Sequence, residues 1–206
     1  MAGTLPHAVF VETGVDDAGR AVAWAAELPG CATMAATPEE AVAAVPARVA
    51  TFVAWLQARG EALVEPVGNW YEVERVACTS NWSVASRAAF SLDDLAPSAA
   101  ELTTWLGWAE LAREELASAL DAHPADADTV TWLADQDTGL VASLGGGAAS
   151  ANKNPPSPDP VDRLYEARDA LLEAIHSAGG AADGVRRAIR LAIADDLRAA
   201  DLLRGR

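Results

Sequence analysis

The stretch 28–41 constrains the fold most, because a strand, a tight turn and a capped helix are all encoded within it. It contains Leu-Pro-Gly-Cys followed by Thr-Pro-Glu-Glu-Ala. The Thr37 hydroxyl can cap a helix, Pro38 suits the first helical position, and Glu40 lies where the carboxylate of a capping box belongs. The stretch therefore predicts a strand, a turn and a helix in direct succession.

Further strands are predicted on both sides of this stretch. Residues 7–13 alternate weakly between apolar and polar side chains, 16–19 supply a turn, and 21–28 read as a second strand. Residues 63–64 and 70–78 predict one or two more strands. The first part of the chain is therefore predicted to be a small antiparallel β-sheet.

One helix is predicted to cover this sheet, over residues 38–59. Its apolar residues recur at intervals of three and four, which is typical of a helix that buries one stripe. They are Val42, Val45, Val49, Phe52, Val53 and Leu56. Pro46 lies within the run and removes a backbone hydrogen bond, so the helix must bend or restart there.

The pattern becomes entirely helical after residue 98. The four predicted helices cover 98–120, 130–144, 161–178 and 182–203. Residues of about 145–160 are rich in Ser, Asn and Pro and are predicted to form a flexible linker. We therefore expect an α+β protein, with an α+β domain over 1–92 and an all-α four-helix bundle over 98–206.

The charge balance excludes several classes of partner. The formal net charge is −15 at pH 7, with a pI near 4.4. Phosphate backbones and anionic lipids attract clustered Lys and Arg, so we expect neither direct nucleic-acid binding nor membrane binding. No apolar segment is long enough to span a bilayer, and the start lacks the pattern of a signal peptide. The sequence thus predicts an acidic cytoplasmic protein.

The two cysteines, Cys31 and Cys78, are predicted to be inert. They lack Cys-x-x-Cys spacing, and a buried reduced thiol is the simplest interpretation in a cytoplasmic protein. A disulfide between them would require that their strands be neighbours. The three histidines, His7, His123 and His176, fall in three different elements. They are therefore predicted to be ordinary surface or core residues.

Residues 7–78 resemble the HicB-like antitoxin domain, through the hairpin, the Leu-Pro-Gly-Cys turn and the Thr-Pro-Glu-Glu-Ala helix start. The resemblance implies a degraded ribonuclease-H-like sheet with one helix. It also implies a protein that covers a small messenger-RNA-cleaving toxin, although many members of the family stand alone. No DNA-binding ribbon or helix-turn-helix pattern follows the predicted sheet in this chain.

Residues 98–206 are similar to the DinB-like four-helix bundle, through Trp-Leu-Ala-Asp-Gln-Asp from residue 132 and Ala-Asp-Asp-Leu-Arg from residue 194. The resemblance implies a divalent metal held by three histidines. Trp132, Ala194 and Arg198 stand at those positions in this chain, and none of these side chains ligates a cation. We therefore predict a degenerate metal site, with no metal and no cofactor.

Acidic residues of the second and fourth predicted helices suggest other chemistry. Asp135, Asp137, Asp195 and Asp196 raise the question of a carboxylate-bridged metal, but neighbours on a helix point about 100 degrees apart. Only one of the last two can face the bundle, so a solvated surface is the simpler interpretation. Alternatively, Arg198 turns inward and pairs with Asp135 or Asp137, so that a fixed charge replaces the metal.

Three of the seven tryptophans mark a candidate ligand pocket. Trp105 and Trp108 share one side of the first helix of the bundle, and Trp132 lies on the second. An aromatic-walled cavity between helices suits a small apolar ligand, whereas core packing is the alternative. The candidate pocket comprises these tryptophans with Asp135 and Arg198.

The sequence assigns no catalytic residue. We expect a binding or interaction protein whose partner is another protein, at the open edge of the sheet, or a small apolar ligand. A homodimer is also possible. Two alternatives stay open: a metal-dependent DinB-type thiol transferase or hydrolase, and a HicB-like antitoxin that masks a ribonuclease toxin.

Overall fold

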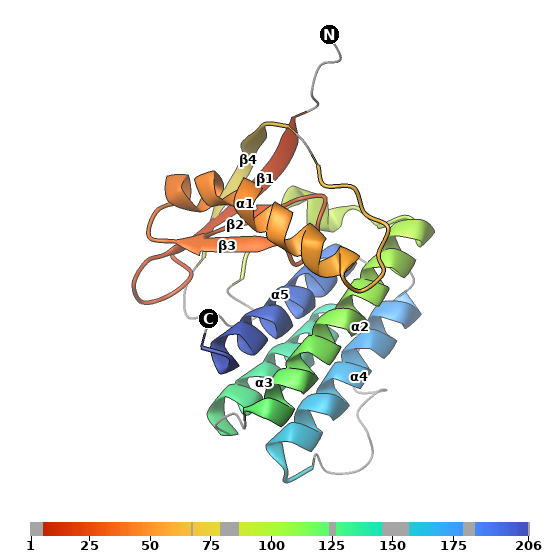
Figure 1. The fold of residues 1–206 in the computed structure, drawn as a ribbon. Coiled ribbons are helices and arrows are strands. Elements are labelled where there is room, and N and C mark those ends of the chain that lie inside the picture. The colour runs from red at the N-terminus through yellow and green to blue at the C-terminus, as the bar shows by residue number, and fades with distance from the viewer. Residues whose placement is uncertain are drawn as a thin grey trace. The chain divides into compact units, whose positions relative to one another are not determined.

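A computed structural model of the chain describes residues 6–66, 68–78, 87–123, 127–145, 157–178 and 184–205. These residues form two compact units, Met1–Leu92 and Asp93–Arg206 (Figure 1). We call the first the sheet unit and the second the helical unit. All described strands belong to the first, so the α+β fold class is confirmed.

The sheet unit contains a mixed four-stranded sheet in the order β3-β2-β1-β4. The strands are β1 (His7–Thr13), β2 (Ala21–Ala25), β3 (Ala32–Ala35) and β4 (Trp70–Ala77). The first three are antiparallel neighbours, but β4 runs parallel to β1. The prediction of a purely antiparallel sheet is therefore wrong. The reason is the intervening helix, which carries the chain back along the sheet as parallel neighbours require.

Two other strand predictions need correction. The second strand, predicted over 21–28, ends at Ala25 because the chain turns there. Leu28 N–H donates to Ala25 O at 3.1 Å and Cys31 N–H donates to Leu28 O at 2.9 Å, which makes two successive tight turns. Residues 63–64 lie outside any strand, so of the one or two strands predicted after the helix the described residues contain one, β4.

Helix α1 (Pro38–Gln57) covers the sheet and is continuous across Pro46. Its buried stripe comprises Ala41, Val45, Val49, Phe52, Val53 and Leu56. The predicted capping box is present: Glu40 N–H donates to Thr37 Oγ1 at 3.2 Å, and Thr37 N–H donates to Glu40 Oε2 at 3.3 Å. These bonds satisfy backbone donors that the first turn of a helix otherwise leaves free.

Replacing Thr37 with alanine is expected to lower the free energy of unfolding of the sheet unit by about 1 kcal/mol, because the cap bond is lost. Thr51→Ala in the same helix is the matched control, since Thr51 is exposed and its hydroxyl only donates to Ala47 O. Urea denaturation followed by circular dichroism measures both. Equal effects of the two substitutions would contradict a stabilising cap.

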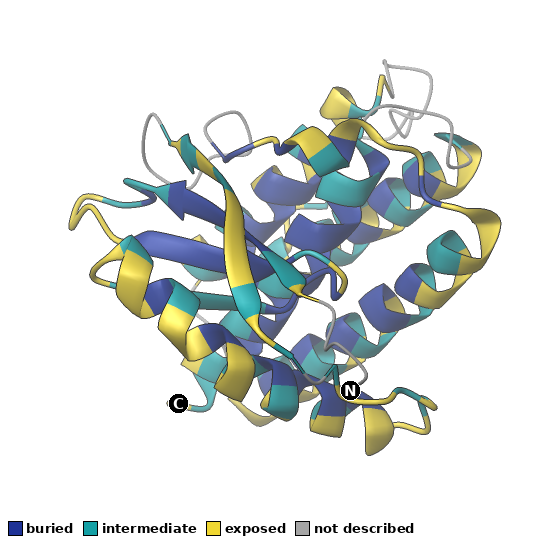
Figure 2. Ribbon diagram, turned by 90° about the horizontal axis from the view of Figure 1, so that it is seen from above, coloured by how far each residue is buried: buried dark blue, intermediate teal, exposed yellow. Residues whose placement is uncertain are grey.

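Both faces of the two central strands are buried, whereas β4 is largely exposed (Figure 2). Arg75 of β4 bonds to Glu39 at the start of α1, so its side chain marks the face that the helix covers. On β1, the Phe10 ring stacks on Phe90 with centroids 4.9 Å apart. The segment after β4 thus contributes to the core of the sheet unit.

The helical unit contains α2 (Ala99–Ala122), α3 (Ala127–Ser143), α4 (Pro160–Ala178) and α5 (Val185–Leu203). These elements match the four predicted helices to within a few residues. α2 packs along α5, and α3 packs along α4. Residues 146–156 of the predicted linker lie outside the described residues.

Ion pairs fix the direction of α5 relative to α2. Arg186, in the first turn of α5, pairs with Glu101 at the start of α2, and Arg204 pairs with Glu115 further along α2. The two helices therefore run in the same direction. The segment before α2 is also bound to α5, because Arg190 Nη2 donates to Asp93 Oδ2 at 2.7 Å.

Candidate functional site

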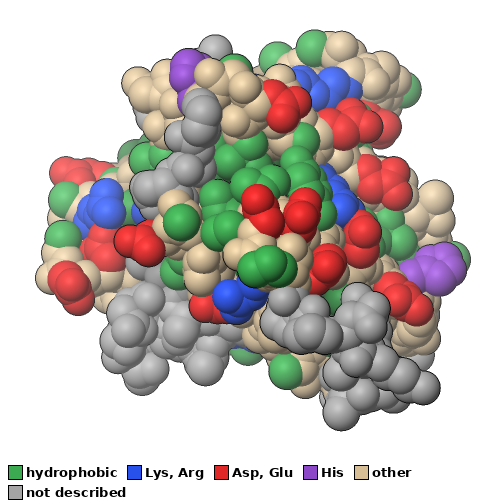
Figure 3. Space-filling model, turned by 90° about the horizontal axis from the view of Figure 1, so that it is seen from below, with side chains coloured by type: hydrophobic (Ala, Val, Ile, Leu, Met, Phe, Trp, Pro, Cys, Tyr) green, Lys and Arg blue, Asp and Glu red, His purple; other side chains and the backbone are tan. Residues whose placement is uncertain are grey.

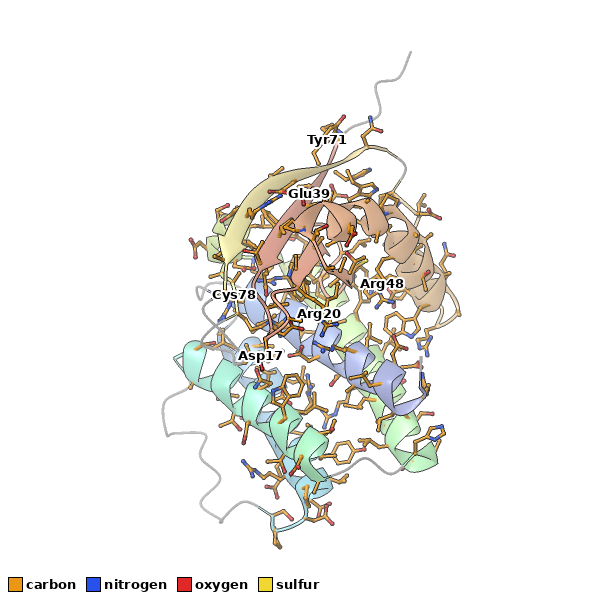
Figure 4. The ribbon with its side chains drawn as sticks, turned by 90° about the vertical axis from the view of Figure 1, so that its left-hand side faces the viewer. Asp17, Arg20, Glu39, Arg48, Tyr71 and Cys78 are labelled. Carbon is orange, nitrogen blue, oxygen red and sulfur yellow. The ribbon has the colours of Figure 1, made fainter. Side chains whose placement is uncertain are left out.

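Strand β4 forms one edge of the described sheet and is its most exposed strand. It is eight residues long, whereas the other edge strand, β3, has four. Tyr71 and Val73 of β4 are 52% and 58% exposed although both are large and apolar; Figure 4 labels Tyr71. An edge strand presents unpaired backbone N–H and C=O groups to other chains. β4 is therefore the best candidate for contact between strands.

A β-bulge at Val73 interrupts the regular pairing of β4 with β1. Val9 of β1 pairs with Glu72, and the next residue, Phe10, pairs with Glu74, so that Val73 has no partner in β1. Bulges commonly reorient one side chain at a sheet edge. Val73 helps to line an open pocket of about 490 Å³, whose other lining residues are Pro6, His7, Ala8, Asn69 and Tyr71. In the described part of the sheet unit, this edge thus combines an exposed strand with an adjoining pocket.

Acidic side chains surround this edge and engage its only arginine. Arg75 donates to Glu72 through Nε at 2.7 Å and through Nη2 at 2.6 Å, and Nη2 also bonds Glu39 at 3.1 Å. Glu74 accepts bonds from Ser91 N–H at 2.9 Å and from its hydroxyl at 2.6 Å. The three carboxylates outnumber the single guanidinium, so the edge carries net negative charge.

The described histidines make ordinary contacts. The His7 ring stacks on Trp70 with centroids 4.7 Å apart, and its Nδ1 lies 3.0 Å from a carboxylate oxygen of Glu27. His123 is the C-cap of α2, and His176 lies in the last turn of α4. Within the described ranges, no three His, Cys, Asp or Glu side chains are grouped so that they could hold a metal.

A buried ion cluster joins α3, α4 and α5 in the helical unit. Arg168 of α4 is 3% exposed, and Asp137 of α3 and Asp196 of α5 are each 1% exposed. Arg168 Nε lies 2.9 Å from Asp137 Oδ2, and Arg168 Nη2 donates to Asp196 Oδ1 at 2.5 Å. Its Nη1 donates to the carbonyl of Ala192 at 3.3 Å. One guanidinium therefore contacts two helices besides its own.

Burial controls the ionisation of these carboxyl groups. Loss of solvation raises the pKa of Asp137 to about 7 and that of Asp196 to about 6, although the charge of Arg168 acts in the opposite direction. Repulsion from Asp195 raises both pKa values further, and repulsion from Asp196 also raises that of Asp137. Although burial opposes it, the same acids raise the pKa of Arg168, which therefore stays charged.

The inward arginine was not singled out from the sequence, but a signal for it exists. Arg168 lies between Leu164, Leu171 and Ile175, which are buried at helical spacing on α4. A charged residue within an apolar stripe is almost never buried unless it is paired. An arginine at this place in the stripe therefore indicates a buried ion pair with a carboxylate.

The predicted metal positions lie on α3 and α5, the two helices that supply the acids of this cluster. Trp132, Ala194 and Arg198 are each half-buried, and Trp132 packs against a core cluster that includes Leu133 and Ala199. Asp135 is exposed and pairs with Arg163 of α4. Asp137, the other acid considered as a partner for Arg198, contacts Arg168.

The tryptophans of the predicted pocket lie at different levels of the helical unit. Trp105 and Trp108 are buried on α2, and the Arg186 guanidinium, at the start of α5, lies 4.7 Å from the Trp105 ring centroid. Trp132 packs near Ala199, which is about 20 Å further along α5 at 1.5 Å per residue. A pocket shared by Trp105 and Trp132 stays a prediction.

Both cysteines are free thiols. Burial raises the pKa of Cys31 to about 12, and partial burial together with Glu12 raises that of Cys78 to about 11. The Cys78 thiol lies 3.6 Å from Glu12 Oε2, and this buried carboxylate also pairs with Arg87 at 3.5 Å. Neither thiol forms the reactive thiolate at neutral pH.

Three comparisons with known proteins found no match to this chain. No protein-family model matches the chain, no curated protein matches it, and no solved structure matches it. Among the described helices, none combines the length and apolar character needed to cross a membrane.

Proposed function

We propose that this chain is a binding protein without catalytic activity, in which the β4 edge pairs with an extended, basic segment of a partner protein. The observation that carries the proposal is an eight-residue edge strand with two exposed apolar side chains beside an open pocket. Backbone bonds along the edge would supply affinity, and the pocket would accept one side chain of the docked strand.

Charge complementarity favours a basic partner over a second copy of this chain. Glu39, Glu72 and Glu74 lie at or beside β4, and Arg75 is already bound by two of them. The chain as a whole is strongly acidic, and the face drawn in Figure 3 shows prominent acidic side chains and few basic ones. Two such edges would repel each other, whereas a basic strand would be attracted to either.

The helical unit acts as a scaffold in this proposal. The resemblance to DinB-like bundles would place Trp132, Ala194 and Arg198 where metal ligands are expected, and these side chains do not bind metal. The nearby core instead holds Arg168 between two aspartates. A fixed cation with paired acids supports a structural role, because it leaves no open coordination position.

The HicB-like resemblance suggests what kind of protein the partner is. If residues 7–78 act as such a domain, the basic partner would be a small ribonuclease toxin that is masked by binding. A mixed sheet with one covering helix supports this form of the proposal. We also propose that the protein is cytoplasmic.

Val73→Lys tests the proposal against Val64→Lys, which introduces the same charge at an 86% exposed valine outside the sheet. The probe is a synthetic peptide of the length of β4 that alternates lysine and valine, with a glutamate-valine peptide as the second probe. Fluorescence anisotropy measures the affinities at low and at high salt.

We expect the basic peptide to bind, and Val73→Lys to weaken it by about tenfold while Val64→Lys has little effect. Such a loss equals about 1.4 kcal/mol. Binding should also weaken as salt is added, since exposed charges are screened. Equal binding of both peptides, equal effects of the two substitutions, or no binding would contradict the proposal. Dimers of the free protein that Val73→Lys abolishes would point to a second copy as the occupant.

A further inference from the structure

Two carboxylates in the helical unit share the edge of a guanidinium that one carboxylate usually occupies alone. The Nε and Nη2 atoms of an arginine point to the same side and form a fork that matches the two oxygens of a single carboxylate. In Arg168, Asp137 takes the Nε end of this fork and Asp196 takes the Nη2 end. Side chains from α3 and α5 thereby contact the same guanidinium.

The two carboxylates outnumber the cation that they both contact. Arg168 of α4 is buried and forms ion pairs with Asp137 and with Asp196. Asp195 of α5 and Arg113 of α2 also act on both carboxyl groups, and Arg113 Nη2 donates to Asp169 at 2.5 Å. Two buried negative charges beside one guanidinium are unfavourable in a medium of low dielectric, so one of them is most readily neutralised by a proton.

Two carboxylate oxygens in the cluster lack a hydrogen-bond donor. Asp137 Oδ2 and Asp196 Oδ2 are buried and accept no hydrogen bond from the described residues, although Arg168 Nε lies 2.9 Å from Asp137 Oδ2. A buried acceptor without a donor destabilises the folded state. A proton bound by the two carboxyl groups removes one negative charge from this buried cluster.

We propose that Asp137 and Asp196 form a proton-binding site in the helical unit, in which the two carboxyl groups hold one proton while Arg168 carries the positive charge. The proton comes from solvent, and no other bond forms or breaks. The two groups titrate as a pair, so the proton belongs to the site and not to either residue alone. This inference does not depend on the proposed function of the β4 edge.

The site couples stability to pH in a defined direction. In the unfolded chain both aspartates titrate near pH 4, whereas in the folded chain the site keeps its proton up to about pH 7. The folded state binds more protons between these values, so the free energy of unfolding falls as the pH rises through this range and levels off above it. The fold therefore responds to acidification near neutrality.

Asp137→Asn tests this coupling, because asparagine imitates the protonated carboxyl at every pH. The melting temperature and unfolding enthalpy of the full chain are measured from about pH 5 to about pH 8 and yield the number of protons released on unfolding. We expect the substitution to reduce this number by about one near pH 6. Asp135→Asn is the control on the same helix, since Asp135 is exposed and pairs with Arg163; it should leave the number unchanged. An unchanged number in Asp137→Asn would overturn the proposal.

A direct titration of the natural protein tests for the bound proton even if Asp137→Asn fails to fold. Carbon NMR of the natural protein, labelled at the aspartate carboxyl carbons, follows each group with pH. We expect one carboxyl signal in the folded state to shift near neutral pH. If every aspartate titrates below about pH 5 in the folded protein, the site holds no proton at neutrality and the proposal fails.

Discussion

Replacing Arg168 with methionine is expected to lower the free energy of unfolding of the helical unit by about 3–5 kcal/mol at neutral pH. The guanidinium forms ion pairs with both Asp137 and Asp196, and both acids are buried. Methionine keeps most of the apolar contacts of the arginine stem but leaves buried carboxylates without their cation. Chemical denaturation followed by circular dichroism measures the loss, with the transitions of the two units fitted separately.

The size of this loss should depend on pH and on the partners. At about pH 5 the two acids can take up protons, so the loss should shrink. A triple variant, with Arg168→Met, Asp137→Leu and Asp196→Leu, should recover much of the stability, since apolar side chains of similar volume often replace buried ion clusters well. An Arg168→Met protein as stable as the natural one at pH 8 would contradict the cluster as described.

Truncating Phe52 to alanine is expected to cost the sheet unit about 3–5 kcal/mol. Phe52 is among the largest fully buried side chains and lies on the stripe of α1 that covers the sheet. Its ring also contacts Trp55 on the same helix, with centroids 5.5 Å apart. The substitution removes apolar contact area and leaves a cavity between helix and sheet.

Phe52→Leu provides the graded comparison, because it keeps most of the buried volume. We expect it to cost less than about 1.5 kcal/mol, as for other swaps between large apolar side chains. Thermal and urea unfolding of both variants give the two values. If alanine and leucine had the same small effect, α1 would not be packed on the sheet through this face.

Local signals in the sequence predicted where the helices begin and which residues they contain. The capping box at Thr37 and Glu40 starts α1 where it was expected, and Ser98 forms a second box with Glu101 at the start of α2. Apolar residues at helical spacing identified each helix, since burial of one stripe is decided locally. Pro46 left open whether the helix bends or restarts there. The apolar stripe continues on both sides of Pro46, and α1 is one continuous helix.

Pairing over long distances was less predictable. The direction of β4 depends on how the chain returns across α1, and no residue of β4 itself encodes it. The bulge at Val73 likewise follows from its register with β1. The sequence drew attention to four acids, Asp135, Asp137, Asp195 and Asp196, and to Arg198, but favoured a solvated surface for the acids. That interpretation is wrong for all of them except Asp135, because the other three are buried. The partner of Asp137 is Arg168, which the packing of α3 on α4 brings close to it.

Amide NMR of the full chain with the lysine-valine peptide tests whether β4 pairs with an extended basic segment. We expect the largest shift changes, and the strongest slowing of hydrogen exchange, at the backbone amides of β4, residues 70–77. Changes centred on β3 or on the helical unit, or the same changes with the glutamate-valine peptide, would contradict a β4 edge that selects a basic strand.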